Sequence, residues 1–357
     1  MFERRVGGLP NLRRDLALKA FAGLWPWEWR LLGNACPPLR LIVRSTDDAL
    51  LGLLPKEWFH AFERLRRFIV GAAERGEKRW ILALLSADQD ALEHMFLLHA
   101  VCRGGHAEIG RMLLRIGADP NLQDEAGVCP LHIAARVNCA ELVSSSMETT
   151  GPLLYSACSF FEALDEEGAE IDAVLASSGA TPLTEAAGAD AADACGALLA
   201  LGAEIERPGR GNLRPLAASA AAGARNALRV LLDAGSVVDA PPGSESMPLH
   251  EAVGKGHAEC VRLLLEAGAK VDASCLLRGT SLHVACRKAR DEVVVLLLER
   301  RADPNALNEQ GQTPLGLAFQ ASQCSRPARA SFKRLRAKLV AAGGVLGEYN
   351  PTLYGGK

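Results

Sequence analysis

The side chains of this sequence that could do chemistry are its eight histidines and ten cysteines. Histidine and cysteine can bind a metal ion, or act together as a nucleophile and its base. Four histidines follow a leucine and form two pairs with a spacing of 33 residues: His99 with His132, and His250 with His283. No cysteine is part of a Cys-x-x-Cys pair or of a motif that joins it to a histidine. The regular spacing has to be explained before any of these residues is given a chemical role.

A repeating unit of 33 residues explains the spacing. Segments that read Thr-Pro-Leu or a close variant begin at residues 181, 214, 247, 280 and 313. Each can start a helix, because threonine caps an N-terminus and proline suits the first helical position. Gly256 and Gly268 can end the two helices of one unit, and Val261, Leu264 and Leu265 form an apolar stripe along the second helix. One such pair cannot bury its own apolar stripe, so neighbouring units must stack.

In these features the chain resembles the ankyrin-repeat family, whose unit has 33 residues and begins Thr-Pro-Leu-His-x-Ala. The best copy runs from Met247 to Ala273. The resemblance implies an all-α ankyrin-repeat solenoid of helix pairs joined by β-hairpin loops, and a non-catalytic interaction module or adaptor for a protein partner. Histidines on successive units would lie roughly 10 Å apart, too far to share one metal ion. The sequence therefore predicts no enzyme, no metal site and no cofactor.

Three parts are expected along the chain: a Trp-rich helical segment at residues 1–60, the repeat array at 61–343, and a flexible tail at 344–357. The array is irregular at residues 140–180, because one unit there is followed by 19 surplus residues.

Two explanations of this irregularity are open. Residues 144–161 form an insertion within one repeat, or Gly151 begins a shortened extra repeat. The second is preferred, because Gly151-Pro-Leu followed by small residues reproduces the start of the unit. The array then has eight or nine units.

The resemblance also places a binding surface on the concave face, at the hairpin tips and the solvent side of the first helices. The residues of this chain at those positions are Arg103, Arg136, Val137, Arg210, Lys255, Arg287, Lys288 and Gln320. Most are basic, which favours an acidic or extended segment of a protein partner, with a merely solvated charged face as the alternative. Nucleic acid is not expected as a partner, because no aromatic residues interleave with the charges.

Residues 15–36 look like an F-box motif, with matching residues at Leu16, Phe21, Leu24, Pro26, Glu28 and Leu32. This second resemblance implies docking to a Skp1-type adaptor. The alternative function is then that of a substrate receptor in a cullin-type ubiquitin ligase. The other interpretation of this segment is a helical cap over the exposed face of the first repeat.

The composition limits the remaining classes of function. Forty lysines and arginines stand against 42 acidic residues, which gives no overall attraction to nucleic acid or membranes. No apolar run reaches the roughly 18 residues that a membrane span needs. The scattered cysteines fit a reducing compartment, so a cytoplasmic or nuclear location, or both, is expected.

Overall fold

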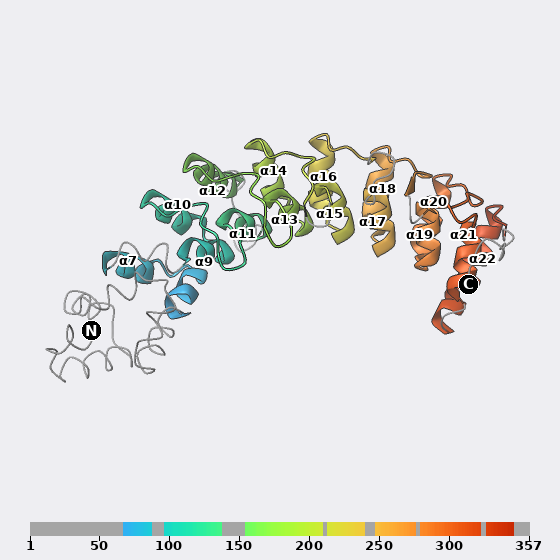
Figure 1. Ribbon diagram of the computed structural model, residues 1–357, viewed down its shortest axis with the longest axis horizontal. Helices are drawn as coiled ribbons and strands as arrows, with labels where there is room; N and C mark the ends of the chain where they lie inside the picture. Colours follow the sequence, from blue (N-terminus) through green and yellow to red (C-terminus); the bar gives the residue numbers. More distant parts are fainter. Residues whose placement is uncertain are drawn as a thin grey trace, which may run out of the picture. The chain divides into compact units, whose positions relative to one another are not determined.

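The computed structural model describes residues 67–87, 96–137, 154–209, 213–239, 247–275, 279–322 and 326–345 of the chain. Two units divide the chain, residues 1–170 (unit 1) and 171–357 (unit 2), and each is described by itself. In both units the described elements are helix pairs that follow one another along the sequence (Figure 1). The predicted all-α repeat solenoid is confirmed.

Unit 1 contains a helical segment at residues 67–74 followed by five labelled helices. These are α7 (Lys78–Ala87), α9 (Leu97–Gly104), α10 (Ala107–Arg115), α11 (Pro130–Arg136) and α12 (Leu154–Glu166). The first helices α9 and α11 pack against each other, and so do the second helices α10 and α12.

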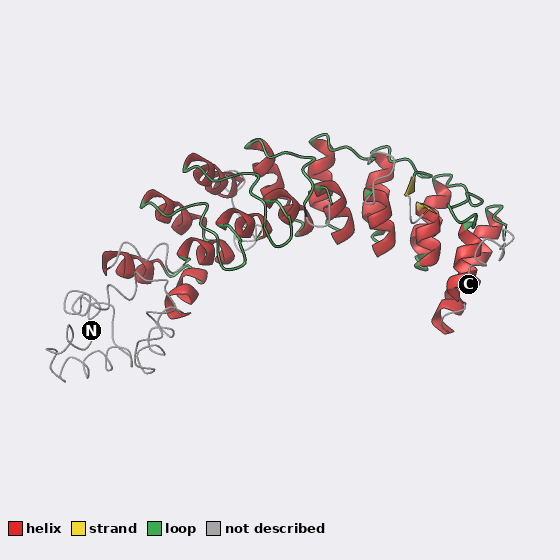
Figure 2. Cartoon of the chain, viewed as in Figure 1, coloured by secondary structure: helices red, strands yellow, loops and turns green. Residues whose placement is uncertain are grey.

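Unit 2 continues the same alternation of first and second helices (Figure 2). Its first helices are α13 (Pro182–Gly188), α15 (Pro215–Ala222), α17 (Pro248–Lys255), α19 (Ser281–Arg287) and α21 (Pro314–Ser322). Its second helices are α14 (Ala192–Ala200), α16 (Arg225–Asp233), α18 (Ala258–Glu266), α20 (Asp291–Glu299) and α22 (Arg326–Ala341). Strands β1 (Ser274–Cys275) and β2 (Gly279–Thr280) pair antiparallel in the hairpin before α19.

The predicted helix signals work as local chemistry requires. Thr181 caps α13 in a capping box: its Oγ1 accepts from the backbone N–H of Thr184 at 3.3 Å, and the Thr184 hydroxyl accepts from the N–H of Thr181 at 2.8 Å. Gly256 ends α17 with φ 88° and Gly268 follows α18 with φ 91°, a region that glycine enters without steric cost.

The core lies between the stacked helices. The leucine of each Pro-Leu start that the structure describes is buried, and Phe160, Phe161 and Leu164 of α12 are fully buried in unit 1. Along α18, Val261 and Leu264 are fully buried as the stripe predicts, whereas Leu265 is only half-buried. Burial of such side chains contributes about 1.5–3 kcal/mol each relative to exposure, so stacking provides most of the stabilisation.

The irregular stretch is one repeat with additional residues between its helices. The backbone N–H of Ala169 donates to the carbonyl of Leu164 at 2.8 Å, which repeats the bond from Ala118 to Leu113 at the end of α10. Helix α12 therefore ends as a second helix ends, and it packs against the second helix α10.

A side-chain amide supports the same assignment. Asn121, in the loop after α10, donates through Nδ2 to the carbonyl of Gly168 at 2.8 Å and accepts through Oδ1 from the N–H of Glu170 at 2.8 Å. In unit 2 the corresponding bonds, such as Asp272 to the N–H of Asp303, join directly successive repeats. One repeat, made of α11 and α12, thus follows Asn121.

The packing of α12 against α10 disagrees with the preferred extra repeat beginning at Gly151 and favours the alternative of an insertion, although residues 154–161 of the expected insertion belong to α12 itself. The additional residues lie between α11 and α12, and residues 138–153 are outside the described part of the chain. A Pro-Leu start indicates where a helix begins but does not indicate which row of helices it joins. Packing against α10 decides that.

The array also reaches slightly further than predicted. The N–H of Gly344 donates to the carbonyl of Leu339, and the N–H of Val345 donates to Oδ1 of Asn305 at 2.8 Å. These two residues belong to the last repeat, and the rest of the predicted tail is outside the described residues.

Candidate functional site

The repeated histidines connect neighbouring repeats. His99, His250 and His283 each donate through Nε2 to a backbone carbonyl 29 residues further along, at 2.8–2.9 Å. All three side chains are fully buried, and His132 is buried as well. These three histidines therefore join one repeat to the next, and the protons that they donate are engaged in the fold.

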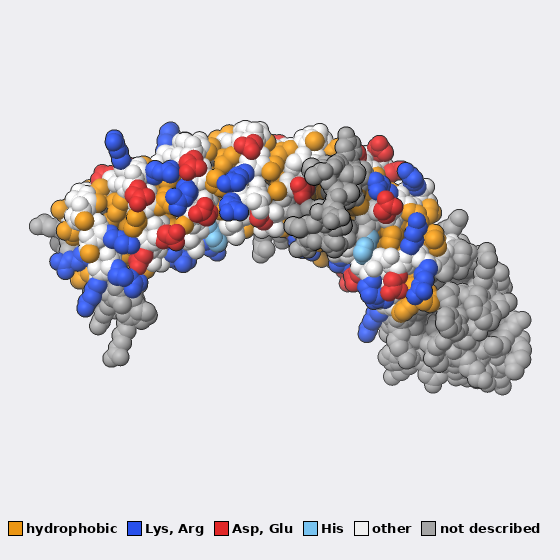
Figure 3. All heavy atoms as spheres, turned by 180° about the vertical axis from the view of Figure 1, so that it is seen from behind, with side chains coloured by type: hydrophobic (Ala, Val, Ile, Leu, Met, Phe, Trp, Pro, Cys, Tyr) orange, Lys and Arg blue, Asp and Glu red, His pale blue; other side chains and the backbone are white. Residues whose placement is uncertain are grey.

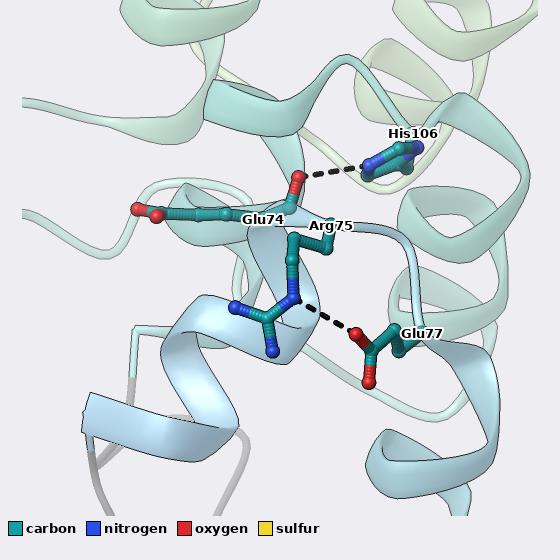
Figure 4. Close-up of polar contacts among 4 residues, drawn as sticks. All are labelled: Glu74, Arg75, Glu77 and His106. Atoms are coloured by element: carbon teal, nitrogen blue, oxygen red, sulfur yellow. Dashed lines mark hydrogen bonds and ion pairs between the residues drawn. The ribbon is translucent and has the colours of Figure 1, made fainter.

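His106 makes a second kind of connection between repeats. Its Nε2 donates to the carbonyl of Glu74 at 2.9 Å, beside the ion pair of Arg75 with Glu77 (Figure 4). Its ring lies so close to Gly76 that a Cβ there would overlap the imidazole, and Gly76 also has φ 71°. The ring of His257 lies against a glycine of the preceding repeat in the same manner.

The cysteines whose side chains the structure describes are buried thiols. Burial raises the pKa of Cys195 and of Cys286 to about 12. A thiol with such a pKa stays protonated near neutral pH and is a poor nucleophile. Cys102 and Cys286 are 2% and 1% exposed, so each acts as a small apolar group in the core.

No three His, Cys, Asp or Glu side chains in the described ranges come together in a group that could hold a metal ion. Among the same residues, no helix is long and apolar enough to cross a bilayer.

The predicted binding residues of unit 1 are at the ends of first helices. Arg103, in the last turn of α9, is exposed and pairs with Glu74 through Nε and Oε1 at 3.0 Å. Arg136 is exposed at the end of α11, and Val137 beside it is half-buried. Arg103 is thus already neutralised within the chain.

The predicted residues of unit 2 are less constrained. Lys255, Arg287, Lys288 and Gln320 are all exposed at or near the C-terminal ends of α17, α19 and α21. No ion pair or hydrogen bond joins Lys255, Arg287 or Lys288 to another described side chain. Lysine and arginine side chains gather at the C-terminal end of this unit (Figure 3). Arg210 lies outside the described residues.

Gln320 contacts the loop that precedes its own helix. Its Oε1 accepts from Nε2 of Gln312 at 3.2 Å, and Gln312 lies in the loop before α21. At α21 the exposed end of the first helix is therefore close enough to the preceding loop for their side chains to touch.

The sequence prediction did not recognise that the first helices at the N-terminal end of unit 2 carry no charged residue at these positions. Near the ends of α13 and α15 the corresponding residues are Gly188, Ala189, Ala221 and Ala222, none of which carries a charge or a long side chain. The alanine-rich sequence of α15 was the available signal. Among these first-helix positions of unit 2, basic residues are thus limited to two successive repeats, those of α17 and α19.

A family model of ankyrin repeats matches the chain at residues 69–147, 216–308 and 249–326, which together make up more than half of it. The chain belongs to the ankyrin-repeat family. Ankyrin repeats indicate a protein–protein interaction module, which agrees with histidines and cysteines that serve the fold.

Solved structures agree with this assignment. The crystal structure of the human ASB11 ankyrin repeat domain is 28% identical, with a TM-score of 0.52, and the match covers 66% of this chain and 96% of that one. No curated protein matches the sequence.

The six F-box-like residues Leu16, Phe21, Leu24, Pro26, Glu28 and Leu32 lie outside the described residues. Docking to a Skp1-type adaptor stays a prediction. Deleting residues 1–45 tests it, because a true F-box would lose that adaptor while the repeats kept their other partners.

Proposed function

We propose that this chain is a non-catalytic adaptor that binds a protein partner through the first-helix surface of unit 2, defined as Lys255, Arg287, Lys288 and Gln320. One observation carries the proposal: three exposed cations occur on two successive first helices with no acidic partner among the described residues. Arg103, at the position in α9 that corresponds to Arg287, is paired inside the chain and offers no such charge.

The charge pattern favours an acidic partner. Each exposed ion pair contributes about 0.2–1 kcal/mol, so three cations change affinity by roughly one to two orders of magnitude at most. Exposed charges also steer the encounter of two proteins, and salt screens them over a Debye length of about 8 Å at physiological ionic strength. Binding through this surface should therefore weaken as salt rises.

A charge-reversal pair tests the proposal. Arg287→Glu with Lys288→Glu reverses the charge of the surface on α19, and Arg225→Glu with Arg229→Glu makes the same change on exposed positions of the second helix α16. Affinity capture with the full chain identifies partners, and binding of the purified partner to each variant is then measured at several salt concentrations.

The α19 variant should lose most of the affinity and flatten the salt dependence, while the α16 variant should bind as the original chain does. Equal effects of the two variants, or no effect of either, would show that the partner binds elsewhere. A comparable surface in unit 1, with Arg136 and Val137, stays a prediction that Arg136→Glu would test in the same assay.

A further inference from the structure

We propose that the first-helix surface of unit 2 recognises an extended acidic segment whose two key carboxylates are three residues apart. This inference rests on the proposed function and adds the conformation and the spacing of the ligand. One carboxylate would lie over α17 at Lys255, and the next over α19 at Arg287 and Lys288.

The spacing follows from the distance between first helices. Lys255, the last residue of α17, and Lys288, which directly follows α19, are separated by one repeat of 33 residues. The two therefore occupy the same position in successive repeats. Packed helices lie about 8–10 Å apart. A polyproline II segment rises 3.1 Å per residue with three residues per turn, so side chains three apart face the same way about 9 Å apart. The distance between successive first helices therefore matches the distance between ligand side chains that are three residues apart.

The width of the surface favours an extended chain over a helix. At α21 the loop and the first helix are close enough for Gln312 and Gln320 to share a hydrogen bond of 3.2 Å. At this repeat two side chains therefore span the distance from the loop to the exposed end of the first helix. A helix with its side chains is about 10–12 Å across, whereas an extended chain presents a single row of side chains.

The residues at the same positions of the neighbouring first helices determine how many carboxylates of the ligand can meet a cation. Towards α13 and α15 the surface continues with Gly188, Ala189, Ala221 and Ala222, which leave room for a ligand but attract no charge. Towards α21 it continues with Gln320, a neutral amide. Two successive carboxylates, and no third, are therefore matched by cations.

The experiment measures binding of short labelled peptides to the full chain by fluorescence anisotropy. The probe has a proline-rich background with two glutamates three residues apart. An isomer of the same composition has them adjacent, and an alanine-based helical peptide has them seven apart, which also spans about 10 Å.

The first peptide should bind more tightly than either of the others by up to about fivefold, the loss expected when one of two exposed ion pairs cannot form. Lys255→Gln should remove this preference, because only one carboxylate then meets a cation. Arg225→Gln with Arg229→Gln, the matched control on α16, should keep it.

Equal binding of all three peptides would overturn the spacing, and preference for the helical peptide would overturn the extended conformation. Tighter binding of single-stranded nucleic acid than of any peptide would overturn a protein ligand. If the peptides are not distinguished but the α19 charge reversal still releases the captured partner, the spacing is wrong and the proposed function stands. If neither experiment discriminates, both are wrong.

Discussion

Among the described residues, two that are not glycine occupy the left-handed turn between a first and a second helix, and they should respond in opposite ways to glycine. The turn residue is a glycine with positive φ at several repeats, such as Gly223 and Gly256. It is Ala289 with φ 54° before α20, and Asp190 with φ 59° before α14. A left-handed conformation costs a residue with a Cβ about 1–2 kcal/mol, which glycine avoids.

For Ala289→Gly the gain exceeds the loss. Glycine lowers the free energy of unfolding by roughly 0.5–1 kcal/mol, because it makes the unfolded chain more flexible. The free energy of unfolding should therefore rise by about 0.5–1 kcal/mol.

For Asp190→Gly the sign should reverse. The Asp190 carboxylate accepts hydrogen bonds at the start of α16, from the N–H of Asn226 at 2.8 Å, the N–H of Ala227 at 2.9 Å and Nδ2 of Asn226 at 3.0 Å. Helix α16 has no cap from its own N-cap residue, Ala224. Loss of a capping side chain costs about 0.5–2 kcal/mol, and a carboxylate near the positive end of the helix dipole adds up to about 1 kcal/mol.

Urea unfolding followed by circular dichroism measures both variants, with the slope of each transition compared to check that the same unit unfolds. The expected order of stability is Ala289→Gly above the original chain and Asp190→Gly below it. If Asp190→Gly is as stabilising as Ala289→Gly, the carboxylate does not hold α16. If Ala289→Gly is destabilising, the turn is not strained.

Two further predictions concern buried polar groups. Ser236 is 6% exposed, and its Oγ has no hydrogen-bond partner among the described residues, so Ser236→Ala should raise stability by about 1 kcal/mol in the same urea assay. Ser219→Ala is the control that should not, because the Ser219 hydroxyl already donates to a carbonyl at 2.8 Å. Burial lowers the pKa of His283 below its usual 6.5, so the folded chain prefers the neutral ring. Stability from this residue should be complete above roughly pH 6.5 and fall as the pH drops towards the folded-state pKa, and His283→Gln should show a smaller loss between about pH 7 and pH 5.

The repeated features were predictable because each depends on a few neighbouring residues. The cap at Thr181 and the turn at Gly256 are local, and the period of 33 residues places His250 and His283 in one role. Features that depend on distant residues were not predictable. Arg103 was expected to be available for a partner, but it meets Glu74 from a different repeat. From the sequence alone Asp190 looks like an ordinary turn residue, because its hydrogen bond to the start of α16 is apparent only in the folded structure.

The assignment of α12 was not predictable for the same reason. The start of this helix could be recognised from the sequence. Whether it is a first or a second helix depended on its packing against α10.

Helices α11 and α12 both keep their packing within unit 1 despite the long connection between them. Helix α11 packs against α9, and the end of α12 is held by Asn121 through Gly168 and Glu170, so each helix has its own anchor. The cost of closing a flexible loop rises only with the logarithm of its length, by about 0.6 kcal/mol for each doubling. A peptide tag or a small domain spliced into residues 138–153 should therefore be carried by this protein without unstacking its neighbours.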